Sequence, residues 1–301
     1  MDSLLYALGF LLFPGLLFVI LMGVLSAWGL RWLATLARRE QASAWRAVFA
    51  DTLTLGRLGL KPSGRELGAT TTALLIGLLA TAMASVSIWR ATFSPEVAYA
   101  NSLVVFLFLL WIPVVGAFYA SDWVARGQGN SQGRDALLLI YDLVLLLALF
   151  VPAVKVRSLL LGDILLAQST AGPQAMSWAG GLSFVVALLA ARVHVSLLGT
   201  LWKESLAEAN GAAEAILVQV LRGASTFVLL ASLVLLFWAG PGSDALVQFT
   251  AFWPKYAVTL ALFGGLFEVM RRRQPERVLA YAWIPLALLA VGALALAAGG
   301  F

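Results

Sequence analysis

Residues 174–191 read QAMSWAGGLSFVVALLAA and residues 223–239 read GASTFVLLASLVLLFWA; between them lies RVHVSLLGTLWKESLAEANGAAEAILVQVLR, residues 192–222. Two apolar runs of this length indicate membrane-spanning helices. The segment that joins them holds charged residues of both signs and the only histidine of the chain. Long apolar runs separated by shorter polar connections continue from here towards both ends of the chain, so the whole sequence follows this pattern.

The composition indicates the same class of protein. Of the 301 residues, 61% are hydrophobic and 12% are charged, and the mean hydropathy is +0.93. A soluble domain has about 25% charged residues. We therefore predict an all-α polytopic membrane protein with about eight transmembrane helices, forming a single integral membrane domain over residues 1–301. The predicted spans are residues 4–30, 68–90, 100–121, 136–154, 174–198, 213–239, 248–269 and 278–298.

The 20 Lys and Arg residues divide unevenly between the two sides of this arrangement. Sixteen lie in or beside the odd-numbered connections, and the other four are Arg90, Lys155, Arg157 and Lys255. By the positive-inside rule, both termini face outward and the cytoplasmic loops are about residues 31–66, 122–135, 199–212 and 270–277. We expect a bacterial inner (cytoplasmic) membrane as the location. Topology and contact with anionic lipids account for the positive charge, so nucleic acid is not expected as a partner.

Two connections are predicted to contain helices of their own. In the first loop, apolar residues recur at roughly helical spacing over residues 45–58. This pattern predicts an amphipathic interfacial helix between the first and second spans. Residues 155–173 are expected to hold a short helix at the outer surface.

The opening third of the chain carries three short motifs in order. Residues 12–18 read LFPGLLF, residues 37–39 read ARR, and residues 49–55 read FADTLTL within the predicted amphipathic helix. They resemble the NuoH-like membrane-anchor subunit of respiratory complex I and of energy-converting hydrogenase-related complexes. Eight spans and a charged cytoplasmic connection between the fifth and sixth also fit that family.

The chain departs from the family's pattern at several positions. Ala27 stands where the family has an acid, and Thr54 stands where it has a lysine. Residues 192–196 read RVHVS, where the family continues with proline and several acids. The resemblance therefore implies the family's structural role more strongly than quinone chemistry.

What the resemblance implies is a non-redox membrane-anchor and coupling subunit, which docks a peripheral electron-transfer arm and links it to ion-translocating, antiporter-like subunits. The chain has no cysteine and one histidine, so we expect no catalytic, cofactor or metal site in it and place the iron–sulfur clusters in partner subunits. Expected partners are complex I-like or hydrogenase-like peripheral subunits, antiporter-like membrane subunits and lipids, with quinone left open. The alternative is a stand-alone polytopic transporter or permease.

Five ionisable residues are candidates for a proton pathway or for coupling: Asp51, Asp142, Glu204, Glu208 and Arg222. The resemblance singles out Asp51. Glu204 and Glu208 lie four residues apart, and loss of water around such a pair favours proton binding; they are otherwise solvated or docking residues. The Arg222 side chain must either extend to the membrane–water interface or form an ion pair, and Asp142 is its best candidate partner. Asp142 is otherwise an interfacial acid that reaches headgroup water.

Partner docking is expected of polar residues on the cytoplasmic side. The sequence places His194 near the cytoplasmic end of the fifth span, where it is either an interfacial polar residue or a switch, since histidine titrates near neutral pH. The docking candidates are Arg38, Arg39, Arg46, Arg192, His194, Lys203 and Glu214.

Overall fold

The computed structural model describes residues 11–37, 69–93, 102–124, 132–207, 212–238, 245–272 and 275–300. Within these residues the protein is almost entirely helical, which confirms the predicted all-α class. The helices are α2 (Leu16–Ala37), α4 (Ala69–Phe93), α5 (Leu103–Val124), α6 (Gln132–Val156), α7 (Leu161–Ala171), α8 (Trp178–Ala207), α9 (Ala212–Trp238), α10 (Ala245–Arg272) and α11 (Pro275–Ala298), with a 3-10 turn at Gln174–Met176.

Each of the eight predicted spans corresponds to one long helix. Helices α2, α4, α6, α8, α9 and α11 are long and apolar enough in their described residues to cross a membrane. Helix α5 contributes a shorter apolar stretch, Leu103–Phe118, and α10 covers the seventh predicted span. The short helix predicted between the fourth and fifth spans is α7. The amphipathic helix predicted at residues 45–58 lies outside the described residues.

Two helix boundaries differ from the prediction. Helix α2 begins at Leu16 and ends at Ala37, whereas the predicted span covers residues 4–30. It starts directly after Pro14 and Gly15, two residue types that are unfavourable inside a helix. Helix α8 continues to Ala207 and α9 begins at Ala212, so most of the connection predicted at residues 199–212 is helical.

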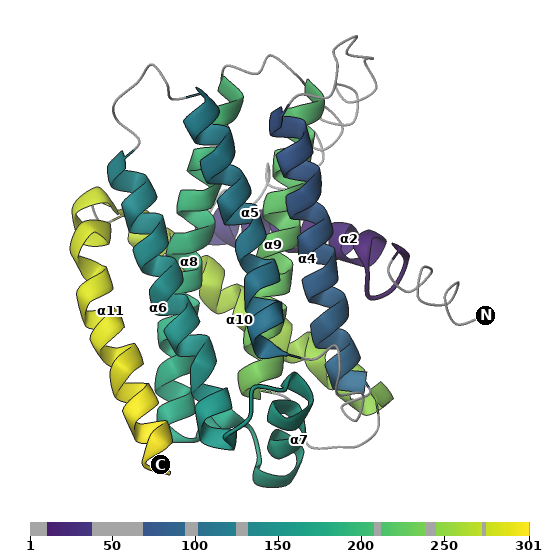
Figure 1. Cartoon of the computed structure of the whole chain (residues 1–301), viewed down its shortest axis with the longest axis vertical. Helices are drawn as coiled ribbons and strands as arrows, with labels where there is room; N and C mark the ends of the chain where they lie inside the picture. Colours follow the sequence, from purple (N-terminus) through teal and green to yellow (C-terminus); the bar gives the residue numbers. More distant parts are fainter. Residues whose placement is uncertain are drawn as a thin grey trace.

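Helices α8 and α9 form the centre of the molecule. In an 18-residue apolar window of each helix, 72% of the residues are buried in α8 and 83% in α9, against 17% in α2 and 22% in α11. Helix α9 contacts α2, α4, α8 and α10. In Figure 1, α4, α5, α6, α8, α9 and α11 run side by side, and α2 crosses behind α9 and α4. Residues 223–238 of α9 contain no charged side chain, so this part of the helix is suited to a buried position.

Helix α2 packs against α9 through two glycines. A Cβ atom at Gly23 would lie 2.5 Å from the backbone N of Ala224, and one at Gly223 would lie 2.8 Å from the carbonyl O of Gly23. The two backbones therefore touch directly, which small residues allow between membrane helices. This contact determines how closely α2 approaches the centre of the bundle.

Candidate functional site

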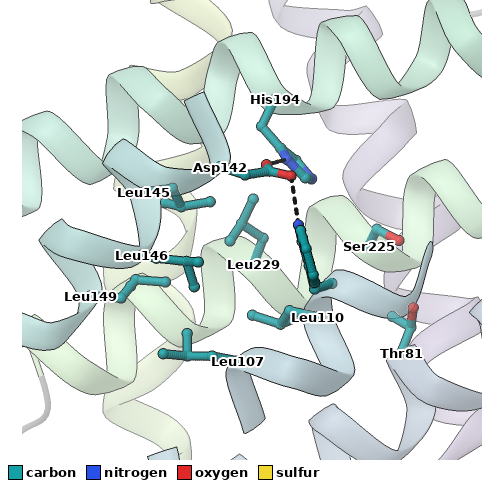
Figure 2. A pocket seen from close by; sticks show the side chains of 11 residues that line it. Thr81, Leu107, Leu110, Asp142, Leu145, Leu146, Leu149, His194, Ser225 and Leu229 are labelled. Atoms are coloured by element: carbon teal, nitrogen blue, oxygen red, sulfur yellow. Dashed lines mark hydrogen bonds and ion pairs between the residues drawn. The ribbon is translucent and has the colours of Figure 1, made fainter. Parts of the chain in front are cut away.

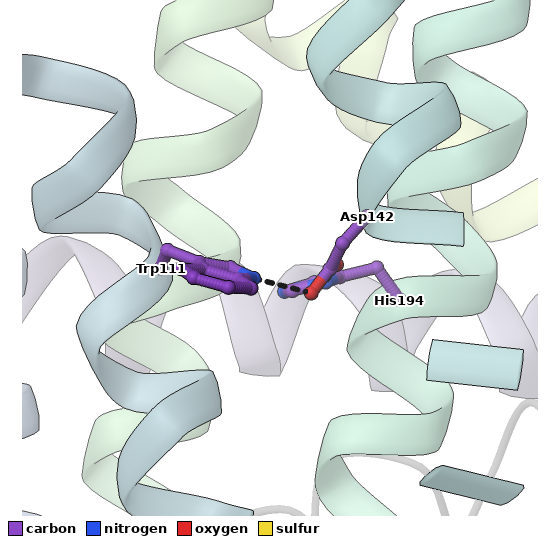
Figure 3. A network of polar contacts seen from close by, with 3 residues as sticks. All are labelled: Trp111, Asp142 and His194. Carbon is purple, nitrogen blue, oxygen red and sulfur yellow. Dashed lines mark hydrogen bonds and ion pairs between the residues drawn. The ribbon is translucent and has the colours of Figure 1, made fainter. Parts of the chain in front are cut away.

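A buried pair of ionisable residues joins α6 to α8. The Nδ1 atom of His194 and the Oδ1 atom of Asp142 are in hydrogen-bond contact, as Figure 3 shows. Asp142 is 4% exposed and His194 is 7% exposed. Their contact requires one proton, carried by either the imidazole or the carboxyl group. A histidine and a carboxyl group in this arrangement can hold a proton and exchange it.

Trp111 of α5 completes this cluster. Its Nε1–H donates a hydrogen bond of 3.1 Å to Asp142 Oδ2. Both oxygens of the carboxyl group are therefore engaged, one by an imidazole and one by an indole. A buried carboxylate is stable only when such donors replace water, so we infer that Trp111 and His194 hold Asp142 inside the bundle.

The pair lies well inside the spans. Helices α6 and α8 meet at two points: Ser183 Oγ donates to the carbonyl O of Ala148, and His194 contacts Asp142. Ala148 follows Asp142 in α6 whereas Ser183 precedes His194 in α8, so the two helices pack antiparallel. Asp142 lies seven residues after the apolar span of α6 begins at Asp135, and His194 lies six residues before that of α8 ends at Thr200. At about 1.5 Å per residue, both positions are roughly 10 Å from the ends of the spans. Ionisable groups at such depth are usually functional.

We expect replacement of Trp111 by phenylalanine to destabilise the protein by about 1.5–3 kcal/mol, the contribution of a hydrogen bond to a charged group. Phenylalanine keeps an aromatic ring at this position but removes the N–H donor. Unfolding of the purified protein in mixed micelles measures the change. Trp178, which is 85% exposed, provides the matched control, because Trp178→Phe removes an indole from the surface. Equal effects of the two substitutions would show that the hydrogen bond does not stabilise the fold.

A cavity of about 30 Å³ adjoins the pair. Its lining is mixed: leucines from α5, α6 and α9 form most of it, and five polar side chains come from α4, α5, α6, α8 and α9. Figure 2 shows Asp142 and His194 above the cavity, with Ser225 and Thr81 together to one side. The polar lining residues are Thr81, Trp111, Asp142, His194 and Ser225.

Two arginines lie on the same central helices. Arg192 is 5% exposed, and its Cζ atom lies 5.2 Å from the centre of the Phe263 ring. The guanidinium of Arg222 lies against Gly199, where a Cβ atom would be 2.9 Å from its Nε. The positive charges of Arg192 and Arg222 repel each other, as do those of Arg222 and Arg31. Glycine at position 199 leaves the space that the Arg222 side chain occupies.

These positions correct two expectations. The partner of Asp142 is His194, not Arg222. His194 is buried between helices rather than interfacial. Arg192, a docking candidate, is also buried, and its docking role stays a prediction. Spacing along one helix indicates which residues share a face, but the face that meets a neighbouring helix depends on packing. The sequence therefore identified the polar residues without identifying their contacts.

For the other candidates, the structure gives either the position on a helix alone or no description. Lys203 and Glu204 lie on α8, and Glu214 lies on the first turn of α9. Asp51, Glu208, Arg38, Arg39 and Arg46 lie outside the described residues. Their docking and coupling roles stay predictions.

Three residues of the site were not among the candidates: Thr81, Trp111 and Ser225. Hydroxyl groups are common in membrane helices, so Thr81 and Ser225 carry no distinctive signal. Trp111 does carry one, because it lies in the middle of an apolar stretch, whereas tryptophans of membrane proteins concentrate at the interfaces. A tryptophan N–H at that depth needs an acceptor, and Asp142 is an acid in the next span.

No protein-family model matches the chain, and no curated protein matches it in sequence. Among solved structures, it is similar to a chain from the membrane-bound sulfane sulfur reductase (MBS), described as an archaeal respiratory membrane complex. The TM-score is 0.66 and the identity 15%, over 94% of this chain and 96% of that chain. At this identity the two chains share a fold, and they share it over nearly their whole lengths.

Proposed function

We propose that this protein is a membrane subunit of a respiratory complex, and specifically a NuoH-like anchor and coupling subunit. The observation that supports this most strongly is the similarity of fold to a chain of the MBS complex, which covers 94% of this protein. The match spans nearly all of both chains rather than one segment of either. The motifs of the opening third, which resemble the complex I and hydrogenase anchor, favour the same class.

In this proposal the subunit carries no redox cofactor. It docks a peripheral electron-transfer arm, with iron–sulfur clusters in the partner subunits, on its cytoplasmic side and contacts antiporter-like subunits within the membrane. Both termini face the outside of a bacterial inner membrane. The buried Asp142–His194 pair supports a part in coupling, since protons bound inside a membrane domain can respond to changes at its surface.

Purification of the chain from its native membrane in mild detergent tests the class of protein. We expect it to co-purify with subunits that contain iron–sulfur clusters and with antiporter-like membrane subunits, identified by mass spectrometry and by the spectra of the clusters. A monodisperse single chain would contradict the proposal and favour a stand-alone transporter.

Neutralising the polar residues tests the coupling role. In the assembled complex, we expect Asp142→Asn and His194→Gln each to lower the number of ions moved per electron transferred while the partners remain bound. Both replacements are close in shape and keep hydrogen-bonding groups, but neither offers the same proton-binding site. Arg222→Gln is made alongside them, to test the arginine on α9. Unchanged ion transport in all three variants would leave only the anchoring role.

A further inference from the structure

The Ser225 hydroxyl group differs from the other buried hydroxyls of the spans. Nine serine and threonine residues are buried in the described part of the chain. Eight of them hydrogen-bond a protein acceptor: Ser26, Thr81, Ser85, Thr92, Ser183, Thr226, Ser232 and Thr259. Most use a carbonyl of their own helix, which is the ordinary solution in a helix interior.

Ser225 is 9% exposed, and its Oγ has no partner among the described residues. Leaving a buried hydroxyl unpaired costs about 1–3 kcal/mol. Its neighbour Thr226 donates to the carbonyl O of Arg222, 2.7 Å away, so the helix geometry here permits such a bond. The unsatisfied hydroxyl instead belongs to the cavity beside Asp142 and His194.

The dimensions and lining of the cavity are suited to water. Its volume of about 30 Å³ exceeds the roughly 10–15 Å³ that one water molecule requires. Water also needs two to four polar partners, and the lining supplies Ser225, Thr81 and the Asp142–His194 pair. A purely apolar cavity of this size would stay dry.

The same lining is less suited to a metal cation. Both oxygens of Asp142 already accept or share N–H groups, from Trp111 and His194. The oxygen atoms that remain are the hydroxyls of Ser225 and Thr81, and Thr81 Oγ1 already donates to the carbonyl O of Gly77. A hard cation takes about six or more oxygen ligands, which these side chains do not provide.

We infer that the cavity is a binding site for water, which hydrogen-bonds Ser225 Oγ and connects it to the Asp142–His194 pair. Ser225 is then a positioning residue, because it holds the water through which the pair exchanges its proton. The water links α9 to the polar groups of α6 and α8. Its role in proton exchange rests on the proposed coupling function, whereas its binding does not.

Infrared difference spectroscopy of the full-length protein in lipid nanodiscs tests the inference. Spectra are recorded between an acidic and an alkaline buffer, in H₂¹⁶O and in H₂¹⁸O. We expect an O–H stretching band of internal water that shifts with the oxygen isotope. Ser225→Ala should abolish this band, and Ser225→Thr, which keeps a hydroxyl, should restore it. An unchanged band in Ser225→Ala would overturn the inference.

Ser232 provides the matched control. It lies two turns further along α9, is 0% exposed, and donates to the carbonyl O of Leu229. Ser232→Ala makes the same chemical change without touching the cavity, so the water band should persist; its loss there would count against a site at Ser225.

The carboxyl band that disappears in Asp142→Asn should shift in Ser225→Ala. If it does not shift, water is not linked to the pair.

The outcomes separate this inference from the proposed function. A chain that co-purifies with redox partners but shows no isotope-sensitive water band overturns the water site and leaves the function. A chain that purifies alone but shows the band, with its loss in Ser225→Ala, retains the water site and overturns the function.

Discussion

Replacing Asp142 with valine is expected to destabilise the protein by about 3–5 kcal/mol, the loss found when one partner of a buried charged pair is removed. The carboxyl group accepts from Trp111 and contacts His194, and both Asp142 and His194 are buried. Valine leaves the imidazole and the indole N–H without their acceptor. His194→Leu should be costly for the same reason, because it leaves the carboxyl group with a single donor.

The double replacement distinguishes a pairing effect from a packing effect. When both polar partners of a buried pair become apolar residues, stability is often unchanged or increased. We therefore expect the Asp142→Val, His194→Leu double variant to be more stable than either single variant. Chemical unfolding in mixed micelles measures all three, and the double-mutant cycle gives the coupling energy.

Asp163 of α7 is exposed and offers the same substitution at the surface. Asp163→Val should change the free energy of unfolding by about 1 kcal/mol or less. If Asp142→Val destabilises the protein no more than Asp163→Val does, the buried pair does not contribute to stability.

The second large effect is expected where α2 meets α9. In Gly23→Ala the new Cβ would lie 2.5 Å from Ala224 N and 2.7 Å from the carbonyl C of Gly223. Both are backbone atoms, which cannot rotate away as a side chain can, so α2 must move outward. We expect a loss of about 3 kcal/mol, at the upper end of the range for overpacking. Thermal unfolding in detergent measures it.

Two other glycines serve as controls for this substitution. A Cβ atom at Gly265 of α10 or Gly292 of α11 would meet nothing within 4 Å. Alanine favours a helix over glycine by about 1 kcal/mol, so Gly265→Ala and Gly292→Ala should be neutral or slightly stabilising. A Gly23→Ala variant that is as stable as these two would contradict the close contact of α2 with α9.

The spans were predictable because their physical cause is local. A helix in lipid must satisfy its own backbone and present about 20 apolar residues in succession, and both requirements are visible in a single stretch of sequence. Boundaries were less predictable: α8 continues to Ala207, past the polar residues Lys203 and Glu204. A helix can extend beyond the membrane without any change in its backbone hydrogen bonding. The ends of an apolar run therefore predict the ends of the membrane span, but not the ends of the helix.

The site was predictable only in part. Asp142 and Arg222 stood out because charged residues are rare within spans, and the sequence then favoured pairing them. The structure instead brings His194 to Asp142 and Arg222 to Gly199. Electrostatic preference suggested the wrong pair because the rotation of each helix, which decides the neighbours of a side chain, is determined by packing around the whole bundle.

The sequence by itself therefore determined that this is an all-α membrane protein, approximately where its helices cross the lipid, and which few ionisable residues lie within them. Those properties follow from the free energy of transferring each segment out of water, and this free energy depends on the composition of the segment alone. Only the tertiary structure decided that Asp142, His194 and Trp111 meet, and that Ser225 faces the same cavity. Each of these residues comes from a different helix. Their meeting depends on packing between helices, such as the contact of Ser183 in α8 with Ala148 in α6, which joins residues that lie far apart in the chain.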